Sequence, residues 1–440
     1  MMKPWFTAAK LGVFVHWGIY AVGRRGGESW PIAGGQVSYD DYLAEMRGFT
    51  AGKYDPSAWA DLFKRAGAKY AVLTTKHHDG MALWPTREDG PNIPSAIGCG
   101  DLVGPYTEAM RQAGLKVGLY FSHTDWSHMG HVAAVSGLSE QEVIRLRGEK
   151  TDWRSIMGQG TADKPGAAEH WAQFLRFHRA QIRELLTDYA PVDLVWFDVH
   201  WGSDRFDYRF SELRDFIHEL SPDTVINSRM DGYGDYETPE QFIPVYPPDG
   251  PWELCLTTNN TWSYTGKEDQ YKTPFELVSM FCECLGMGGN LLLNVGPDEH
   301  GVIPRQQVEL LECIGNWIQR NEEAVHGTQR GLPAGYSCNF TGLNESRDVL
   351  YVYLTHLPAD PDGGTSIKGI RNRIQHITLL GPGAECSHKR VGGAHWLNVP
   401  GTLWIDVPRK NLDPLVSVLK IELDGPLDLY DGSAVEIDQN

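Results

Sequence analysis

Hydrophobic and polar positions form two alternating patterns over the first three quarters of the chain. Short, continuously apolar runs predict buried β-strands at residues 11–17, 69–76, 115–122, 192–198, 223–229 and 290–297. Apolar residues at helical spacing predict helices at 56–67, 103–114, 167–190, 210–220, 274–289 and 304–325. Strands that are apolar on both faces and alternate with helices indicate a parallel sheet covered by helices.

The α/β pattern fits a barrel better than a doubly wound sheet. About seven strand–helix units over about 325 residues predict an irregular (β/α)8 TIM-like barrel, although one or two units are hard to find. From Gly327 onward the pattern changes to β runs separated by Gly and Pro turns, which predict an antiparallel β-sandwich. We therefore expect a catalytic barrel over residues 1–328 and a C-terminal sandwich over 329–440.

Charge and hydropathy narrow the classes of partner. The formal net charge of −18 argues against nucleic acid, because phosphate binding needs a basic surface. No apolar run approaches the roughly 18 residues that span a membrane, so no membrane partner is expected. The chain shows no signal-peptide pattern, so it is expected to be cytoplasmic as given, or secreted or periplasmic if a signal was removed. The sequence leaves the oligomeric state open.

Ionisable and aromatic side chains cluster where the predicted strands end. They are His16, Lys76, His77, His78, Asp79, Tyr120, Trp196, Asp198 and Arg229. One such residue alone would be explained by a local hydrogen bond or a helix cap. Their coincidence at several successive strand ends predicts one pocket at the C-terminal face of the barrel, where barrel enzymes place their chemistry.

Several chemistries can be compared with this cluster. The sequence has no H-E-x-x-H pattern of zinc proteases, no G-x-S-x-G pattern of serine hydrolases and no P-loop of nucleotide-binding proteins. Two carboxylates, Asp198 and a downstream Glu, together with His and Trp side chains suit glycoside hydrolysis without a metal or another cofactor. The alternatives are a metal-dependent hydrolase that uses His16, His77, His78 and Asp198, and a sugar-binding protein without catalysis.

The histidine pair poses a geometric problem. Neighbouring residues of a regular strand point to opposite faces, so only one of His77 and His78 would reach the pocket. We expect both to reach it, which requires the backbone to leave β geometry at the strand's end. Gly80 would then make the turn with a positive φ, and Lys76 would form a structural ion pair.

The stretches around these strand ends resemble the family 29 α-L-fucosidases. The matching segments are "KLGVFVHWGIYAV", "GGESW", "KYAVLTTKHHDGMALWP", "GLKVGLYFSHTDW", "VDLVWFD", "SRMDGYGDYETPE", "WELCLTTNNTWSY" and "GGNLLLNVGPDEHGVIP". The resemblance covers roughly residues 5 to 328. It implies a barrel followed by a β-sandwich, and a retaining exo-hydrolase that releases L-fucose from fucosylated oligosaccharides or glycoconjugates.

The resemblance also implies residue roles. Asp198 matches the nucleophile and Glu240 the acid/base, with Glu237 and Glu253 as rivals for the second role. The fucose-binding positions match His16, Glu28, Trp30, His77, His78, Tyr120, Trp196 and Arg229. Ser263 stands where the family usually has Gly, and residues 127–167 look like an insertion. These departures leave the linkage open, and a related sugar such as an α-L-galactoside remains an alternative substrate.

Overall fold

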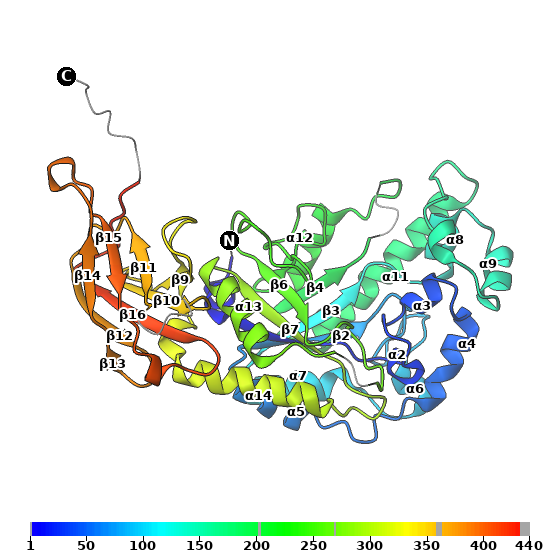
Figure 1. Cartoon of the computed structure of the whole chain (residues 1–440). Helices are drawn as coiled ribbons and strands as arrows, with labels where there is room; N and C mark the ends of the chain where they lie inside the picture. The colour runs from blue at the N-terminus through cyan, green and yellow to red at the C-terminus, as the bar shows by residue number, and fades with distance from the viewer. Residues whose placement is uncertain (1, 201–203, 268–269, 358–362, 432–440) are drawn as a thin grey trace.

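The structure is a computed structural model that describes residues 2–200, 204–267, 270–357 and 363–431. Parallel strands form one curled sheet in the order β5-β4-β3-β2-β1-β7-β6 (Figure 1). Its strands are β1 (Leu11–Val15), β2 (Tyr70–Lys76), β3 (Lys116–Ser122), β4 (Leu194–Asp198), β5 (Val225–Ile226), β6 (Glu253–Thr257) and β7 (Asn290–Val295). This arrangement confirms the predicted α/β barrel-like class.

The eighth position of the barrel is filled by an irregular segment. Isolated parallel bridges join Asn227 to Tyr236 on one side, and Glu237 to Trp252 and Glu240 to Cys255 on the other. Residues 236–240 therefore lie between the two edge strands β5 and β6. The apolar pattern missed β6 because polar residues alternate along it, with Glu253 and Thr257 at its ends.

The sheet carries helices on its outer face (Figure 1). The main helices between the strands are α5 (Pro56–Arg65), α7 (Val103–Gln112), α11 (Ala167–Asp188), α12 (Phe210–Leu220), α13 (Pro274–Gly286) and α14 (Arg305–Arg320). Shorter helices are α1 (Pro4–Ala9), α2 (Tyr20–Gly23), α3 (Trp30–Ala33), α4 (Tyr39–Ala44) and α6 (Ile93–Ile97). None of the helices in the described ranges is long and apolar enough to cross a membrane.

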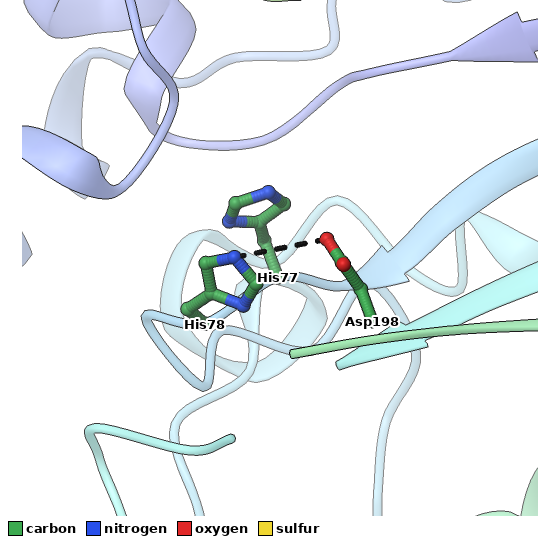
Figure 2. A group of neighbouring side chains, drawn as sticks. All are labelled: His77, His78 and Asp198. Atoms are coloured by element: carbon green, nitrogen blue, oxygen red, sulfur yellow. Dashed lines mark ion pairs between the residues drawn. The ribbon is translucent and has the colours of Figure 1, made fainter. Parts of the chain in front are cut away.

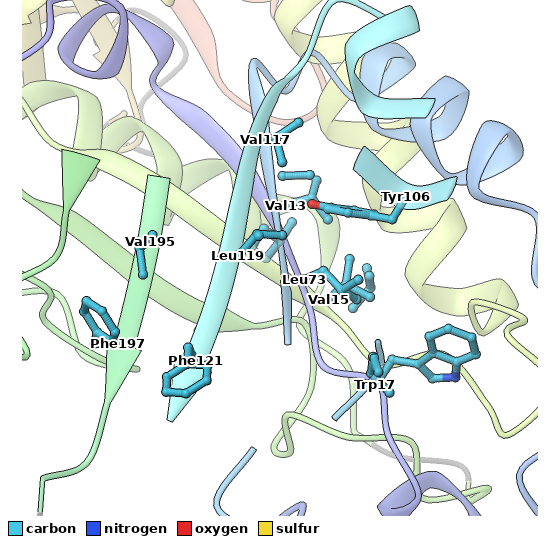
Figure 3. Close-up of a cluster of buried hydrophobic side chains, with 14 of the residues drawn as sticks. Val13, Val15, Trp17, Leu73, Tyr106, Val117, Leu119, Phe121, Val195 and Phe197 are labelled. Carbon is cyan, nitrogen blue, oxygen red and sulfur yellow. The ribbon is translucent and has the colours of Figure 1, made fainter. Parts of the chain in front are cut away.

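Strand alternation assigns each side chain to one of two layers. The outer layer packs against the helices and includes Val13, Val15, Leu73, Leu119, Phe121, Val195 and Phe197 (Figure 3). The inner layer includes Phe14, Tyr70, Val72, Tyr120, Leu194, Trp196 and Leu292, with Phe6 of α1 packed against it. Continuing the inner series along β1 and β4 brings His16 and Asp198 to the same side as Tyr120 and Trp196.

The end of β2 interrupts this alternation. Thr74 pairs with Tyr120 but Lys76 pairs with Phe121, so one extra residue, Thr75, sits in β2. The bulge turns Lys76 outward, where its Nζ lies 2.6 Å from Asp125 Oδ2 in a fully buried ion pair. The strand ends there, and Gly80 makes the following turn with φ of 80°. The predicted Lys76 pair and Gly80 turn are thus present.

The insertion lies at the end of the molecule away from the C-terminal strands (Figure 1). It forms α8 (Met129–Ser136), α9 (Glu140–Arg147) and α10 (Trp153–Ile156). Arg154 of α10 places its guanidinium carbon 5.0 Å from the centre of the Trp30 ring. The predicted insertion therefore contacts Trp30, which the family resemblance predicts to bind the sugar.

Two antiparallel sheets follow the barrel. The six-stranded sheet has the order β13-β12-β16-β10-β9-β8 and the three-stranded sheet β11-β15-β14. Their strands are β8 (Gln329–Arg330), β9 (Phe340–Leu343), β10 (Val349–Leu354), β11 (Thr365–Lys368), β12 (Ile374–Leu379), β13 (Ala384–Glu385), β14 (His388–Val391), β15 (Thr402–Ile405) and β16 (Ser417–Leu423). Leu350, Ile367, Leu403 and Leu419 belong to one buried cluster of this part.

The six-stranded sheet also contacts the barrel. Tyr353 of β10 donates a hydrogen bond to the Ala324 carbonyl (2.7 Å), and Trp317 of α14 donates to the Val416 carbonyl (2.6 Å). The boundary between the predicted barrel domain (1–328) and the predicted sandwich domain (329–440) stays a prediction. Residues 432–440 of the second domain lie outside the described part of the chain.

Candidate active site

Asp198, the last residue of β4, accepts hydrogen bonds from three directions. Tyr120 donates its hydroxyl to Oδ2 (2.9 Å), while Arg229 Nη1 (2.7 Å) and the Val199 amide (3.0 Å) donate to Oδ1. An ionised carboxylate only accepts, so this set of donors suits it. The three donors come from three different segments and fix the direction in which the carboxylate points.

The residue after Asp198 has a strained backbone. Val199 has φ of 35°, a region that β-branched residues rarely adopt. The Thr124 amide (3.0 Å) and hydroxyl (2.9 Å) both donate to the Val199 carbonyl and hold this conformation. The strained turn directs the Val199 amide back onto the Asp198 carboxylate, and such strain is typical of functional sites.

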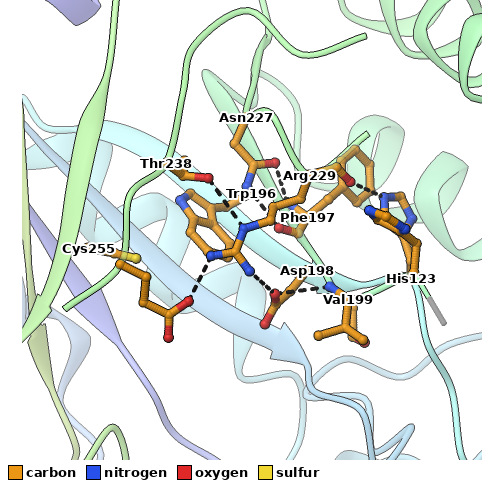
Figure 4. Close-up of polar contacts among 12 residues, drawn as sticks. His123, Trp196, Phe197, Asp198, Val199, Asn227, Arg229, Thr238 and Cys255 are labelled. Carbon is orange, nitrogen blue, oxygen red and sulfur yellow. Dashed lines mark hydrogen bonds and ion pairs between the residues drawn. The ribbon is translucent and has the colours of Figure 1, made fainter. Parts of the chain in front are cut away.

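Arg229 joins Asp198 to Glu240. Figure 4 shows its contact with Asp198. Its Nη1 bonds Asp198, and its Nη2 lies 2.8 Å from Glu240 Oε2. The guanidinium carbon also lies 5.1 Å from the centre of the Trp196 ring. Glu240 comes from the irregular segment that closes the barrel, and its side chain is 41% exposed, so it can be reached from solvent.

The two rival glutamates lie elsewhere. Glu253 is fully buried and accepts hydrogen bonds from the Tyr70 hydroxyl, Trp196 Nε1 (3.1 Å) and the Tyr236 hydroxyl (3.3 Å). Burial raises the pKa of Glu253 to about 7. Glu253 lies in the otherwise apolar inner layer of the barrel. Glu237 is an exposed residue whose backbone bridges Trp252.

The three histidines are each held through Nδ1. The partners are Asn294 Oδ1 for His16 (2.7 Å), Ser29 Oγ for His77 (2.6 Å) and Ser122 Oγ for His78 (2.7 Å). Burial lowers the pKa of His16 and of His78 to about 3, and that of His77 well below its usual value. All three imidazoles are therefore neutral at ordinary pH.

Hydrogen-bond partners also fix two of the tautomers. The Ser122 hydroxyl donates to the Thr124 carbonyl (2.6 Å), so His78 Nδ1 must donate to Ser122. The carboxamide oxygen of Asn294 likewise requires a donor at His16 Nδ1. Both rings consequently present Nε2 as an acceptor, and His78 Nε2 has no hydrogen-bond partner among the described residues.

His77 and His78 both lie close to Asp198, whereas regular strand alternation would turn one of them away (Figure 2). The His77 ring stacks on Tyr120 (centroids 5.5 Å apart, planes 7° apart), and His78 Nε2 lies 3.8 Å from Asp198 Oδ2. The bulge at Thr75 and the end of β2 account for the two inward rings.

Glu28 and Trp30 complete the predicted set. Glu28 is buried with φ of 51°, and its amide donates to Ser263 Oγ (3.4 Å). Burial raises the pKa of Glu28 to about 8, and Glu240 and Asp198 add to the effect. Its Oε1 has no hydrogen-bond partner in the described part of the chain. The Trp30 ring lies edge-on to His78, with centroids 5.1 Å apart.

A metal ion is geometrically conceivable at one point. One ligand atom each from His77, His78 and Asp198 lies within 4.8 Å of the others. However, Tyr120 and Arg229 already bond the two oxygens of Asp198, and the Arg229 cation would repel a metal beside it. The residues fit a neutral, hydrogen-bonding ligand better than a cation.

Sequence reasoning missed the residues that hold the predicted ones in place. Ser29, Ser122 and Asn294 orient the histidines, and the Asn227 side chain exchanges two 2.8 Å hydrogen bonds with the backbone of Phe197 (Figure 4). Ser122, Asn227 and Asn294 lie inside predicted strands, and Ser29 lies between the predicted site residues Glu28 and Trp30. Short polar side chains beside an expected site residue were the available signal.

Comparisons with known proteins agree on one family. The family model for Alpha-L-fucosidase matches residues 1–323. Tissue alpha-L-fucosidase from Rattus norvegicus is 29% identical over 442 residues, which cover 91% of this chain and 84% of the relative. The Bos taurus tissue enzyme is 29% identical over 364 residues, 74% of this chain and 69% of its own.

Solved structures give the same result. Alpha-L-fucosidase isoenzyme 1 from Paenibacillus thiaminolyticus superposes with a TM-score of 0.79 at 29% identity, over 96% of this chain and 98% of its own. The enzyme from Vibrio sp. strain EJY3 gives a TM-score of 0.80 at 27% identity, over 97% and 73%. The chain therefore belongs to the alpha-L-fucosidase family and is a fucose-releasing glycoside hydrolase.

Proposed function

We propose that the enzyme is a retaining exo-α-L-fucosidase, with Asp198 as nucleophile and Glu240 as acid/base. The observation that carries this proposal is the shared guanidinium of Arg229, which bonds both carboxylates through its two terminal nitrogens. Retaining enzymes hold their two carboxyls about 5 to 5.5 Å apart, against roughly 6.5 to 9.5 Å in inverting ones. We expect the shorter range when substrate is bound.

In the first step, an Asp198 oxygen attacks the anomeric carbon from one face. The bond to the leaving oxygen breaks, its electron pair stays on that oxygen, and Glu240 supplies the proton. In the second step Glu240 takes a proton from water, the water oxygen attacks the same carbon, and Asp198 leaves as a carboxylate. Two inversions give net retention.

In the free enzyme the Arg229 guanidinium bonds the Glu240 carboxyl. A neighbouring cation favours the ionised form of a carboxyl, which is the form that acts as base in the second step. To act as acid Glu240 must first move from the guanidinium toward the glycosidic oxygen. Its partial exposure and its place on an irregular segment allow such a movement. Arg229 would remain with Asp198 and keep the nucleophile in line.

Sugar recognition follows from the donors and acceptors around the carboxylates. The Nε2 atoms of His16 and His78 would accept hydrogen bonds from fucose hydroxyls. The other predicted residues, Glu28, His77, Trp30, Tyr120, Trp196 and Arg229, would contact the ring. Phe14 and Trp262 flank His16, with centroids 4.4 and 4.9 Å away. These rings would give the C6 methyl an apolar wall, which favours a fucoside over an α-L-galactoside carrying a hydroxyl there.

Replacing the nucleophile should abolish turnover and permit chemical rescue. Asp198→Gly should lower kcat on an aryl α-L-fucoside by several orders of magnitude, because no group remains to attack the anomeric carbon. Azide should partly restore turnover and give the β-fucosyl azide by attack from the vacated face. The matched control Glu237→Gln should behave as wild type. Near-wild-type activity of Asp198→Gly would contradict the assignment of Asp198 as nucleophile.

Replacing the acid/base should produce a different pattern. Glu240→Gln should slow substrates with a poor leaving group far more than a dinitrophenyl fucoside, whose leaving group needs no proton. Azide should give the α-fucosyl azide, because Asp198 still forms the intermediate. The same leaving-group dependence in Glu237→Gln or Glu253→Gln, with Glu240→Gln unaffected, would move the role to that residue.

The two histidines should contribute binding energy without a metal. His77→Ala and His78→Ala should each weaken binding of a fucose-configured iminosugar by about 1 to 3 kcal/mol, the usual cost of a lost buried hydrogen bond, as measured by calorimetry. His356→Ala, at an exposed histidine, is the control. Activity should be unchanged by EDTA; loss on chelation with recovery on added metal would instead support the metal-dependent alternative.

A further inference from the structure

We propose that His123 is a positioning residue that fixes the backbone of Arg229, and that His178 and Arg179 hold the His123 ring in place through a second hydrogen bond at Nδ1. The inference rests on the roles proposed above for Asp198 and Glu240. It concerns a buried group of side chains behind the pocket that the two-step mechanism does not use.

His123 forms hydrogen bonds to the backbone carbonyls of both Asp198 and Arg229. Its amide donates to the Asp198 carbonyl (2.9 Å), and its ring Nε2 lies 3.1 Å from the Arg229 carbonyl. Figure 4 shows the ring beside Phe197, on which it stacks with centroids 4.3 Å apart and planes 12° apart. One buried residue thus joins the strand of the nucleophile to the segment that carries Arg229.

The hydrogen bonds behind His123 can run in one direction only. A guanidinium donates and never accepts, so Arg179 Nη1 donates to His178 Nδ1 (2.9 Å). Neutral His178 then carries its proton on Nε2 and donates to His123 Nδ1 (3.0 Å). His123 in turn carries its proton on Nε2, where the Arg229 carbonyl can only accept.

Burial keeps both rings neutral. His123 and His178 are both fully buried, and burial lowers the pKa of each well below its usual value. A second proton on His123 would remove the acceptor that His178 needs. Arg179 is itself anchored, because its Nη2 donates to the Tyr208 carbonyl (2.5 Å).

This support matters because regular structure ends before Arg229. The preceding strand β5 has only two residues, Val225 and Ile226, and Asn227 is the last residue before Arg229 that bonds β4. A shift of the Arg229 backbone would move the guanidinium that joins Asp198 to Glu240. Misplacing catalytic groups by about 1 Å can cost on the order of 100-fold in rate.

Substitution at His178 tests the inference without touching the pocket. In His178→Phe the ring of His123 loses its partner at Nδ1 and is held at Nε2 alone, so it can turn away from the Arg229 carbonyl and loosen that segment. We expect kcat on an aryl α-L-fucoside to fall about ten-fold or more, with a smaller change in KM. His178→Gln, whose amide can donate to Nδ1, should recover most of that loss.

The control is His131→Phe, at another fully buried histidine that packs on Phe174 outside this chain of hydrogen bonds. It should retain wild-type kcat. Nitrogen NMR on histidine-labelled enzyme should show the wild-type His123 protonated at Nε2. Its Nδ1 should show the shift of a hydrogen-bond acceptor in the wild type and in His178→Gln, but that of an unbonded nitrogen in His178→Phe.

Two results would overturn the inference. One is a wild-type His123 protonated at Nδ1, which can be measured even if His178→Phe does not fold. The other is a His178→Phe enzyme as active as His131→Phe. Failure of the proposed function would show itself differently, as wild-type activity in Asp198→Gly, and would leave the tautomer measurement unaffected.

Discussion

The guanidinium of Arg229 donates to Asp198 through one terminal nitrogen and to Glu240 through the other. One planar, permanently charged group thereby sets the spacing of two carboxylates that come from different parts of the sheet. Without the positive charge of Arg229, the two neighbouring carboxylates would repel each other. The remaining site residues either fix one of these three side chains or surround the place where a sugar ring would lie beside them.

The barrel supplies this arrangement through two departures from regularity. The extra residue Thr75 in β2 turns Lys76 into the outer layer and lets His77 and His78 both lie close to Asp198. On the far side, residues 236–240 replace a regular eighth strand, and this places Glu240 where it meets Arg229. A regular strand at either point would have fixed these side chains by simple alternation, with one histidine directed away from the site.

Much of this could be predicted from the sequence, because apolar strands and amphipathic helices leave strong periodic signals. The ends of β1, β2, β3 and β4 were therefore located within about two residues, and the polar side chains there were expected to meet. The strand β6 was missed, since Glu253 and Thr257 at its ends leave an apolar run of only three residues, and no local pattern shows that Glu253 is bonded by Trp196 in the barrel interior. The partners His123 and His178 lie 55 residues apart, and no local pattern predicts their hydrogen bond.

The central claim is that Asp198 attacks the anomeric carbon while Arg229 holds it in line. A 2-deoxy-2-fluoro-fucosyl fluoride tests it directly, because fluorine at C2 slows both steps while the fluoride leaving group lets the first proceed. Mass spectrometry of the digested enzyme should find one fluorofucosyl group on the peptide of β4, attached at Asp198. A label on Glu240 or on another carboxylate, or turnover with inversion and no label, would contradict the account.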